Sequence, residues 1–129
     1  MTIRFPLEKI SGFNFADGLE RCLNDPDFYW TLLLDFRDRF GGVAETAELL
    51  IQHNQWQEAA ELIHTLKGTA GQLGLAGVQA SATGLNDDLN RTLDAGLAPT
   101  TLTPNLNHVR QELDRMTRVI QSIADQSKS

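Results

Sequence analysis

The sequence has few of the features that mark membrane, secreted or zinc-binding proteins. Among its 129 residues there is a single cysteine, Cys22, which can form neither an internal disulfide nor a cluster of zinc ligands. No apolar run approaches the roughly 18 residues that span a bilayer, and the N-terminus lacks the basic and then apolar order of a secretory signal. We therefore expect a soluble intracellular domain in which Cys22 is a small core residue.

Basic residues are also scarce. Asp and Glu outnumber Lys and Arg by 17 to 11, which gives a formal net charge of -6, and the basic residues are scattered along the chain. Nucleic-acid binding is therefore not expected. The acidic residues Asp87, Asp88, Glu58 and Glu61 are interpreted as a solvated face, although they could also repel or steer a partner.

Strand patterns are almost absent, because apolar residues recur at intervals of three and four instead of alternating. The sequence therefore predicts an all-α protein. With 41% hydrophobic residues, the chain is long enough for one ordinary core. We predict one domain over residues 1–129, consisting of an N-terminal arm at 1–15, a helical bundle at 16–126 and a frayed polar tail at 127–129.

Capping residues predict where the helices begin and end. Asp25 can cap a helix whose first position is Pro26, and Gly41-Gly42 should end it. Thr103-Pro104 is expected to open the last helix. Helices are predicted at residues 16–23, from 26 to the glycine pair, and at 43–53, 55–73, 76–94 and from 103 onward. The four long ones should form an antiparallel four-helix bundle, with an additional short N-terminal helix and arm.

Each helix has an apolar stripe that predicts its buried face. The stripes are Tyr29, Leu32, Leu33, Phe36 and Phe40; Val43, Ala47, Leu50 and Ile51; Val78, Ala82, Leu85, Leu89 and Leu93; and Leu106, Val109, Leu113, Met116, Ile120 and Ile123. Trp30 and Leu34 form a second apolar side, which either the arm or a partner covers; we favour the arm. Its apolar anchors are Phe5, Leu7, Ile10, Phe13 and Phe15. Trp30, Trp56, His53 and His108 are interpreted as structural.

The helix at residues 55–73 carries the strongest functional signal. A helical wheel places Ala59, Leu62, Ile63, Leu66, Ala70 and Leu73 on one apolar face. His64 lies away from that face, and its neighbours on the same outer surface are Ala60, Gly68 and Gly71, with Lys67 in reach at i+3. An internal glycine costs a helix about 1 kcal/mol relative to alanine. Core packing does not explain two outward glycines, whereas close docking of another molecule beside the imidazole does.

An exposed imidazole can act as a nucleophile toward phosphorus near neutral pH. The phosphoryl group in transfer carries negative charge, which the nearby Lys67 could stabilise. The sequence has no glycine-lysine loop for nucleotide phosphates and no carboxylate cluster arranged for magnesium. We therefore expect a phosphoryl carrier that is not itself an ATP-using enzyme, binds no cofactor or metal, and depends on Mg²⁺ held by its partner.

The stretch HTLKGTAGQLGL at residues 64–75 resembles the signature of histidine-containing phosphotransfer (HPt) domains. The resemblance extends to Gly18-Leu19, to the pattern from Asp27-Phe28-Tyr29 to Phe36, and to residues 56–60, and so covers nearly the whole chain. Thr69 and Gly71 depart from it, since many members carry serine or alanine at such positions. A hydrogen bond from a hydroxyl after the glycine is therefore not carried over.

The resemblance implies that His64 accepts the phosphoryl group, that Lys67 stabilises its charge, and that Gly68 admits the partner. Docking would also involve Ala60 and Gly71. The partners would be response-regulator receiver domains, and the domain would be a monomeric four-helix bundle. It would be a cytoplasmic protein, either free-standing or the C-terminal domain of a membrane-anchored hybrid sensor histidine kinase.

Other functions make different predictions about His64 and about self-association. A helical bundle that binds haem or a metal would need His64 buried among inward ligands. A helical adaptor would bind a receiver or another partner without transferring phosphate. A kinase dimerisation domain would need a self-associating two-helix hairpin.

Overall fold

The computed structural model describes residues 3–6 and 10–127, and these residues form helices and connecting segments without a strand. The helices are α1 (Phe15–Arg21), α2 (Pro26–Phe40), α3 (Val43–Gln52), α4 (Trp56–Gln72), α5 (Ala76–Ala95) and α6 (Leu102–Gln126). None of these helices combines the length and apolarity needed to cross a membrane.

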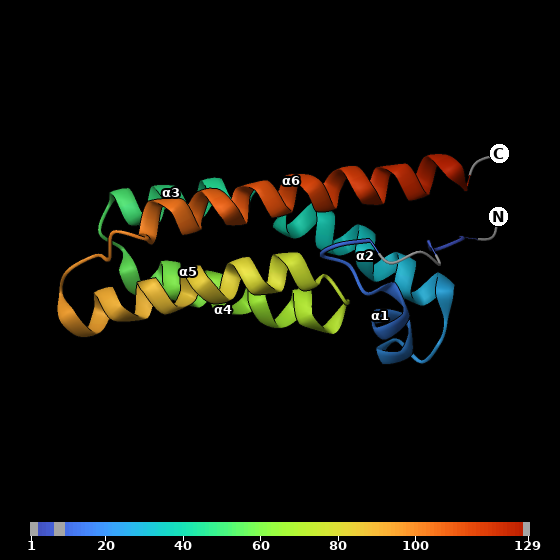
Figure 1. The fold of residues 1–129 in the computed structure, drawn as a ribbon, viewed down its shortest axis with the longest axis horizontal. Helices are drawn as coiled ribbons and strands as arrows, with labels where there is room; N and C mark the ends of the chain where they lie inside the picture. The colour runs from blue at the N-terminus through green and yellow to red at the C-terminus, as the bar shows by residue number, and fades with distance from the viewer. Residues whose placement is uncertain (1–2, 7–9, 128–129) are drawn as a thin grey trace.

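The long helices form an antiparallel bundle, as predicted (Figure 1). α4 packs against α5, and α5 packs against α6. The fourth side of the bundle is formed by two helices, α2 and α3. They follow one another along α6, and both pack against it (Figure 1). The predicted bundle is confirmed, and the short α3 completes the side that α2 begins.

Local capping explains the limits of α2. The Asp25 carboxylate accepts hydrogen bonds from the amides of Asp27 and Phe28, and Pro26 takes the first helical position. The helix ends at Phe40, directly before the glycine pair, as expected. α1 ends at Arg21, two residues earlier than predicted, because Leu23 has a positive φ of 62° that a helix cannot contain.

The predicted stripes supply most of the core. All six stripe residues of α6 are buried, as are Tyr29, Leu33, Phe36 and Phe40 of α2. Leu32, Leu50, Ile51 and Leu62 are only half-buried. The prediction for Leu93 was wrong, because its side chain is 40% exposed. Thr92, at i+3 from Leu89, takes the inward position instead and is buried.

The N-terminal arm covers the second apolar side of α2. The Phe5 ring lies 5.0 Å from the Tyr29 ring and 6.3 Å from the Trp30 ring, measured between centroids. Phe13 and Phe15 stack on each other and are buried. The expectation that the arm covers this side is thus confirmed for Phe5 and Trp30, while Leu7 and the tail residues 128–129 lie outside the described residues.

The arm and α1 are fixed to the turn between α4 and α5. The Asn14 amide donates to the Gly74 carbonyl at 2.7 Å, and the Gly77 amide donates to the Gly12 carbonyl at 2.8 Å. Gly74 has a φ of +70°, and a Cβ there would lie 2.1 Å from the Asn14 carbonyl oxygen. Only glycine fits such a close approach of two backbones.

Asp88 is not part of a solvated face, and that interpretation was wrong for this residue. Its side chain is buried on α5 and accepts hydrogen bonds from the Thr101 hydroxyl at 2.8 Å and from the Asn105 amide at 2.7 Å. Asp87, Glu58 and Glu61 are exposed, as expected. Asp88 therefore joins α5 to the start of α6, which the sequence pattern did not show.

The residues interpreted as structural have structural contacts. The His53 ring caps α3 through a 2.8 Å contact between Nδ1 and the Leu49 carbonyl oxygen, and Nε2 of His108 lies 3.8 Å from Oε1 of Glu112. Trp56 is half-buried and packs against the core. Cys22 is buried, and burial raises the pKa of its thiol. A thiol in that setting behaves as a small core residue.

Candidate functional site

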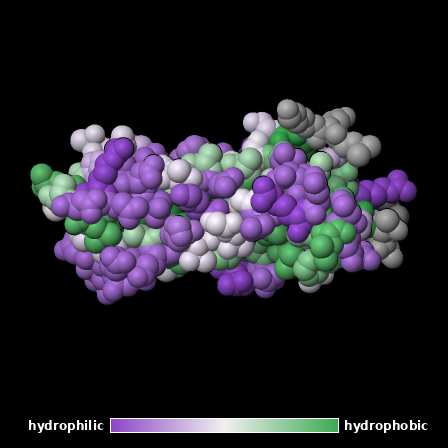
Figure 2. All heavy atoms as spheres, turned by 90° about the horizontal axis from the view of Figure 1, so that it is seen from below, coloured by the Kyte–Doolittle hydropathy of each residue, from purple (hydrophilic) through white to green (hydrophobic). Residues whose placement is uncertain are grey.

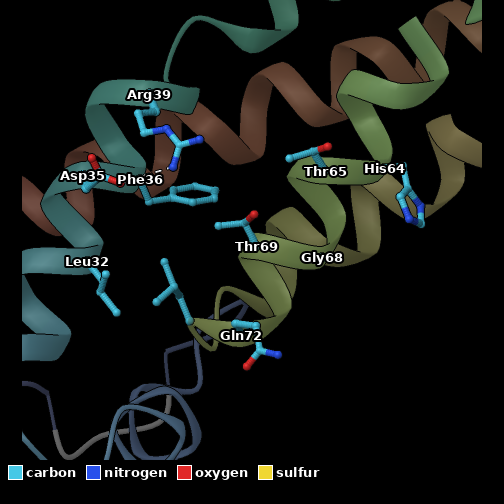
Figure 3. Close-up of a pocket in the computed structure, with 10 residues that line it drawn as sticks. Leu32, Asp35, Phe36, Arg39, His64, Thr65, Gly68, Thr69 and Gln72 are labelled. Carbon is cyan, nitrogen blue, oxygen red and sulfur yellow. Dashed lines mark hydrogen bonds and ion pairs between the residues drawn. The ribbon is translucent and has the colours of Figure 1, made fainter. Parts of the chain in front are cut away.

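His64 lies in the middle of α4 and is exposed. Figure 3 shows its ring pointing away from α2, whereas Thr65 and Thr69 point toward α2. Among the described residues, no hydrogen bond or ion pair engages the His64 ring. The imidazole is therefore open to a reactant arriving from solvent.

The buried face of α4 explains why His64 is exposed. Ala59, Ile63, Leu66 and Ala70 of α4 are fully buried. His64 lies on the opposite side of the helix, so packing of the apolar stripe turns the ring outward. This exposure does not fit a bundle in which His64 would be an inward ligand. Among the described residues, no group of three or more His, Cys, Asp or Glu side chains could hold a metal ion.

Gly68, one turn after His64, lies in open space. Within residues 3–6 and 10–127, a Cβ built on Gly68 would meet no atom within 4 Å apart from its own helix and chain neighbours. No neighbour in the described part of the chain therefore requires glycine at this position, although glycine weakens the helix. The expectation that Gly68 lies on the outer surface of α4 is confirmed, and its role in docking a partner stays a prediction.

Gly71 differs from Gly68. A Cβ on Gly71 would lie 2.5 Å from Nε2 of Gln79 on α5, so that the flexible Gln79 side chain would have to move. Gly71 is half-buried, and Gln79 is exposed. The neighbouring helix thus accounts for at least part of the requirement for glycine here, which the sequence pattern could not indicate.

The prediction that Ala60 lies on the outer surface beside His64 was wrong. Ala60 is 5% exposed, and its carbonyl accepts a hydrogen bond of 3.1 Å from the Asn86 side-chain amide on α5. Although Ala60 and His64 are one turn apart, α5 packs on the side of the helix toward Ala60. Ala60 forms part of the wall of a hollow next to His64 rather than an open surface.

Lys67 is half-buried on α4, three residues after His64. Among the described residues, its ammonium group makes no ion pair or hydrogen bond. Residues at i and i+3 are neighbours on a helix surface. Lys67 is therefore a cation without a partner among the described residues, on the helix surface next to His64.

Hollows on different sides of α4 meet at His64 and Gly68. One lies between α2 and α4, and Leu32, Asp35, Phe36 and Arg39 form its α2 wall (Figure 3). On the α5 side, Asn86 and Asn90 line a hollow with His64, while Gly68 also borders a hollow toward α1. Sequence inspection missed these flanking residues, because nothing in the order of residues shows which helices lie beside α4.

Comparison with known proteins agrees with this arrangement. A family model described as Hpt domain matches residues 31–119, which is more than half of the chain. The match begins inside α2 and ends inside α6, so that it includes His64, Lys67 and Gly68. Comparisons with curated proteins and with solved structures give no match.

Proposed function

Because this chain belongs to the Hpt domain family, whose members are histidine phosphotransfer domains of phosphorelays, we propose that His64 is its phosphoryl-carrying residue. Hpt domains interact with receiver domains of response regulators. In this proposal His64 takes the phosphoryl group from an aspartate of one receiver and passes it to an aspartate of another receiver.

The observation that carries the proposal is the bare surface around the ring. His64 is exposed with no partner among the described residues, and nothing stands above Gly68 one turn away. In-line transfer between two proteins requires the phosphorylated aspartate to come within bonding distance of the imidazole. The exposed ring and the open space at Gly68 permit that approach from solvent.

The transfer step itself requires little from the carrier. The unprotonated nitrogen of the neutral imidazole attacks the phosphorus, the nitrogen–phosphorus bond forms as the bond to the aspartate oxygen breaks, and the aspartate leaves as a carboxylate. The other ring nitrogen keeps its hydrogen. The reverse step delivers the group to a second receiver.

Lys67 and the partner's metal would share the stabilisation of charge. Negative charge spreads over the equatorial phosphoryl oxygens during transfer, and a cation near them lowers the barrier. Lys67 is the cation on α4 next to His64, while we propose that Mg²⁺ is held by the receiver. The chain would then carry the phosphoryl group between receiver domains without using ATP itself.

Label transfer tests this function directly. Receiver domains from the same organism are phosphorylated, mixed with the protein in the presence of magnesium, and followed for movement of label. The wild type should gain acid-labile label and His64→Gln should gain none, with the same helical circular dichroism. The exposed His108→Gln is the matched control and should accept label like wild type. Receiver binding without label on the wild type would instead indicate an adaptor.

A further inference from the structure

The hollow on the α1 side of Gly68 combines the open surface of α4 with polar groups from other parts of the chain. Its lining includes Gly68 and Gln72 of α4, Gln79 of α5, and Asp17 and Arg21 of α1. Seen from below, hydrophilic residues cover much of the surface, with a pale central zone of intermediate hydropathy and hydrophobic patches toward both ends (Figure 2). A molecule that docks on Gly68 therefore meets a polar wall formed by α1.

The position of that wall is fixed by close packing. A Cβ on Gly18 of α1 would lie 2.3 Å from the Tyr29 hydroxyl oxygen and 2.5 Å from the Leu73 carbonyl oxygen. With the backbone bond from Asn14 to Gly74, this contact holds α1 against the end of α4. The exposed side chains of α1 thus have a defined place relative to His64.

Arg21 presents donors that the protein does not use. Its Nε donates to Asp17 Oδ2 at 3.0 Å, and its side chain is 50% exposed. Among the described residues, the two terminal nitrogens of its guanidinium have no hydrogen-bond partner. Asp17 therefore orients the guanidinium and leaves its outer edge free, an arrangement suited to a carboxylate or carbonyl oxygen of a partner.

The wall formed by α1 also lies outside the segment that the family model matches. The family match begins at residue 31, after α1 has ended, whereas His64, Lys67 and Gly68 fall inside it. The residues of the proposed transfer site thus lie inside the matched segment, whereas Arg21 lies before it. A side chain that borders the docking surface but takes no part in the transfer step is suited to selecting among related partners.

We propose that α1 forms part of the receiver-binding surface and that Arg21 is a specificity-determining residue. Its free guanidinium edge donates to a carboxylate or carbonyl oxygen on the receiver, next to the phosphorylated aspartate. The inference rests on the proposed function, because it takes the docked partner to be a receiver. It adds a residue that contributes to binding and not to the chemistry.

The experiment separates binding from chemistry. The probe is the receiver domain, among those of the same organism, that transfers label fastest to the wild type. Its affinity is measured for wild type, Arg21→Glu and Arg21→Gln. Arg118→Glu is the matched control, because it makes the same change of charge at an exposed position of α6, which lines none of the hollows described around His64. Phosphoramidate, a small phosphoryl donor, reports on His64 without a partner.

Arg21→Glu should weaken receiver binding about tenfold relative to Arg118→Glu, mainly through slower association, and Arg21→Gln should weaken it about threefold. Both Arg21 variants should take label from phosphoramidate at the wild-type rate. Equal receiver affinity of Arg21→Glu and Arg118→Glu would overturn the role of Arg21 and leave the function intact. A wild type that takes no label from any receiver would overturn the function and this inference together.

Discussion

The Tyr29 hydroxyl on α2 donates a 2.6 Å hydrogen bond to the carbonyl oxygen of Leu73, where the helix that carries His64 ends. Both residues are buried. The bond ties α2 to the end of α4 at the place where Gly18 of α1 also makes contact. One side chain thus connects the arm, α2 and the helix of the candidate site.

Removal of this hydroxyl should destabilise the protein without altering the chemistry at His64. Tyr29→Phe leaves the Leu73 carbonyl without its hydroxyl donor in a buried place, which should lower the free energy of unfolding by about 1 to 3 kcal/mol. Urea denaturation measures the loss. Labelling of His64 by phosphoramidate should stay at the wild-type rate, and an unchanged unfolding midpoint would show that the bond contributes nothing.

The same residue predicts a loss of stability at high pH. Burial, and secondarily the nearby Cys22 and Asp17, raise the pKa of Tyr29 well above its ordinary value of 10.0. The unfolded chain loses this proton near pH 10 and the folded chain does not, so stability from this group is complete below pH 10 and falls as pH rises further. Tyr29 is the only tyrosine. Its tyrosinate absorbance should therefore appear only as the protein unfolds.

Substitutions of Gly68 should separate stability from transfer. Gly68→Ala should raise helix stability by about 1 kcal/mol, because its Cβ meets nothing within 4 Å. Gly68→Gln should keep the fold and slow receiver-dependent transfer by about a hundredfold, since it fills the surface on which the partner docks. Quenched time courses of label transfer measure the transfer rate, and thermal melts measure the stability. Wild-type transfer by Gly68→Gln would refute docking on this surface.

Loss of the Lys67 charge should reduce transfer less severely. Lys67→Ala is expected to slow transfer about tenfold, which corresponds to about 1.4 kcal/mol of transition-state stabilisation. Lys67→Arg keeps the positive charge and should recover most of the rate. Single-turnover transfer under saturating receiver isolates this effect from binding. If Lys67→Ala transferred as fast as wild type, Lys67 would have no part in the mechanism.

Asp88 and Asp87 form a matched pair for testing the role of the buried carboxylate. Asp88→Ala removes the acceptor shared by Thr101 and Asn105 and should cost about 2 kcal/mol of stability. Asp87→Ala changes the same charge at an exposed position and should stay within about 0.5 kcal/mol of wild type. Equal losses from the two substitutions would mean that the contacts of Asp88 are not stabilising.

Much of the fold and the centre of the site follow from local properties of the sequence. Periodicity and caps depend on residues only a few positions apart, so Asp25-Pro26, Gly41-Gly42 and the stripe of the last helix predicted their elements correctly. The exposure of His64 and the open space at Gly68 follow equally from the apolar face of their own helix. The sequence motif and the helical wheel were sufficient to predict that His64 and Gly68 are exposed.

Packing between helices decided the surroundings of Ala60, Gly71 and Asp88, which the sequence did not predict. The helical wheel placed Ala60 and Gly71 on the outer surface with His64, but Asn86 and Gln79 of α5 lie against them. In the same way, the start of α6 encloses Asp88. These outcomes depend on how α5 is rotated and positioned against its neighbours, which residues distant in the chain determine together. The spacing of apolar residues along one helix does not predict where a neighbouring helix lies. It does predict which face of α4 is buried and, opposite to it, that His64 faces water.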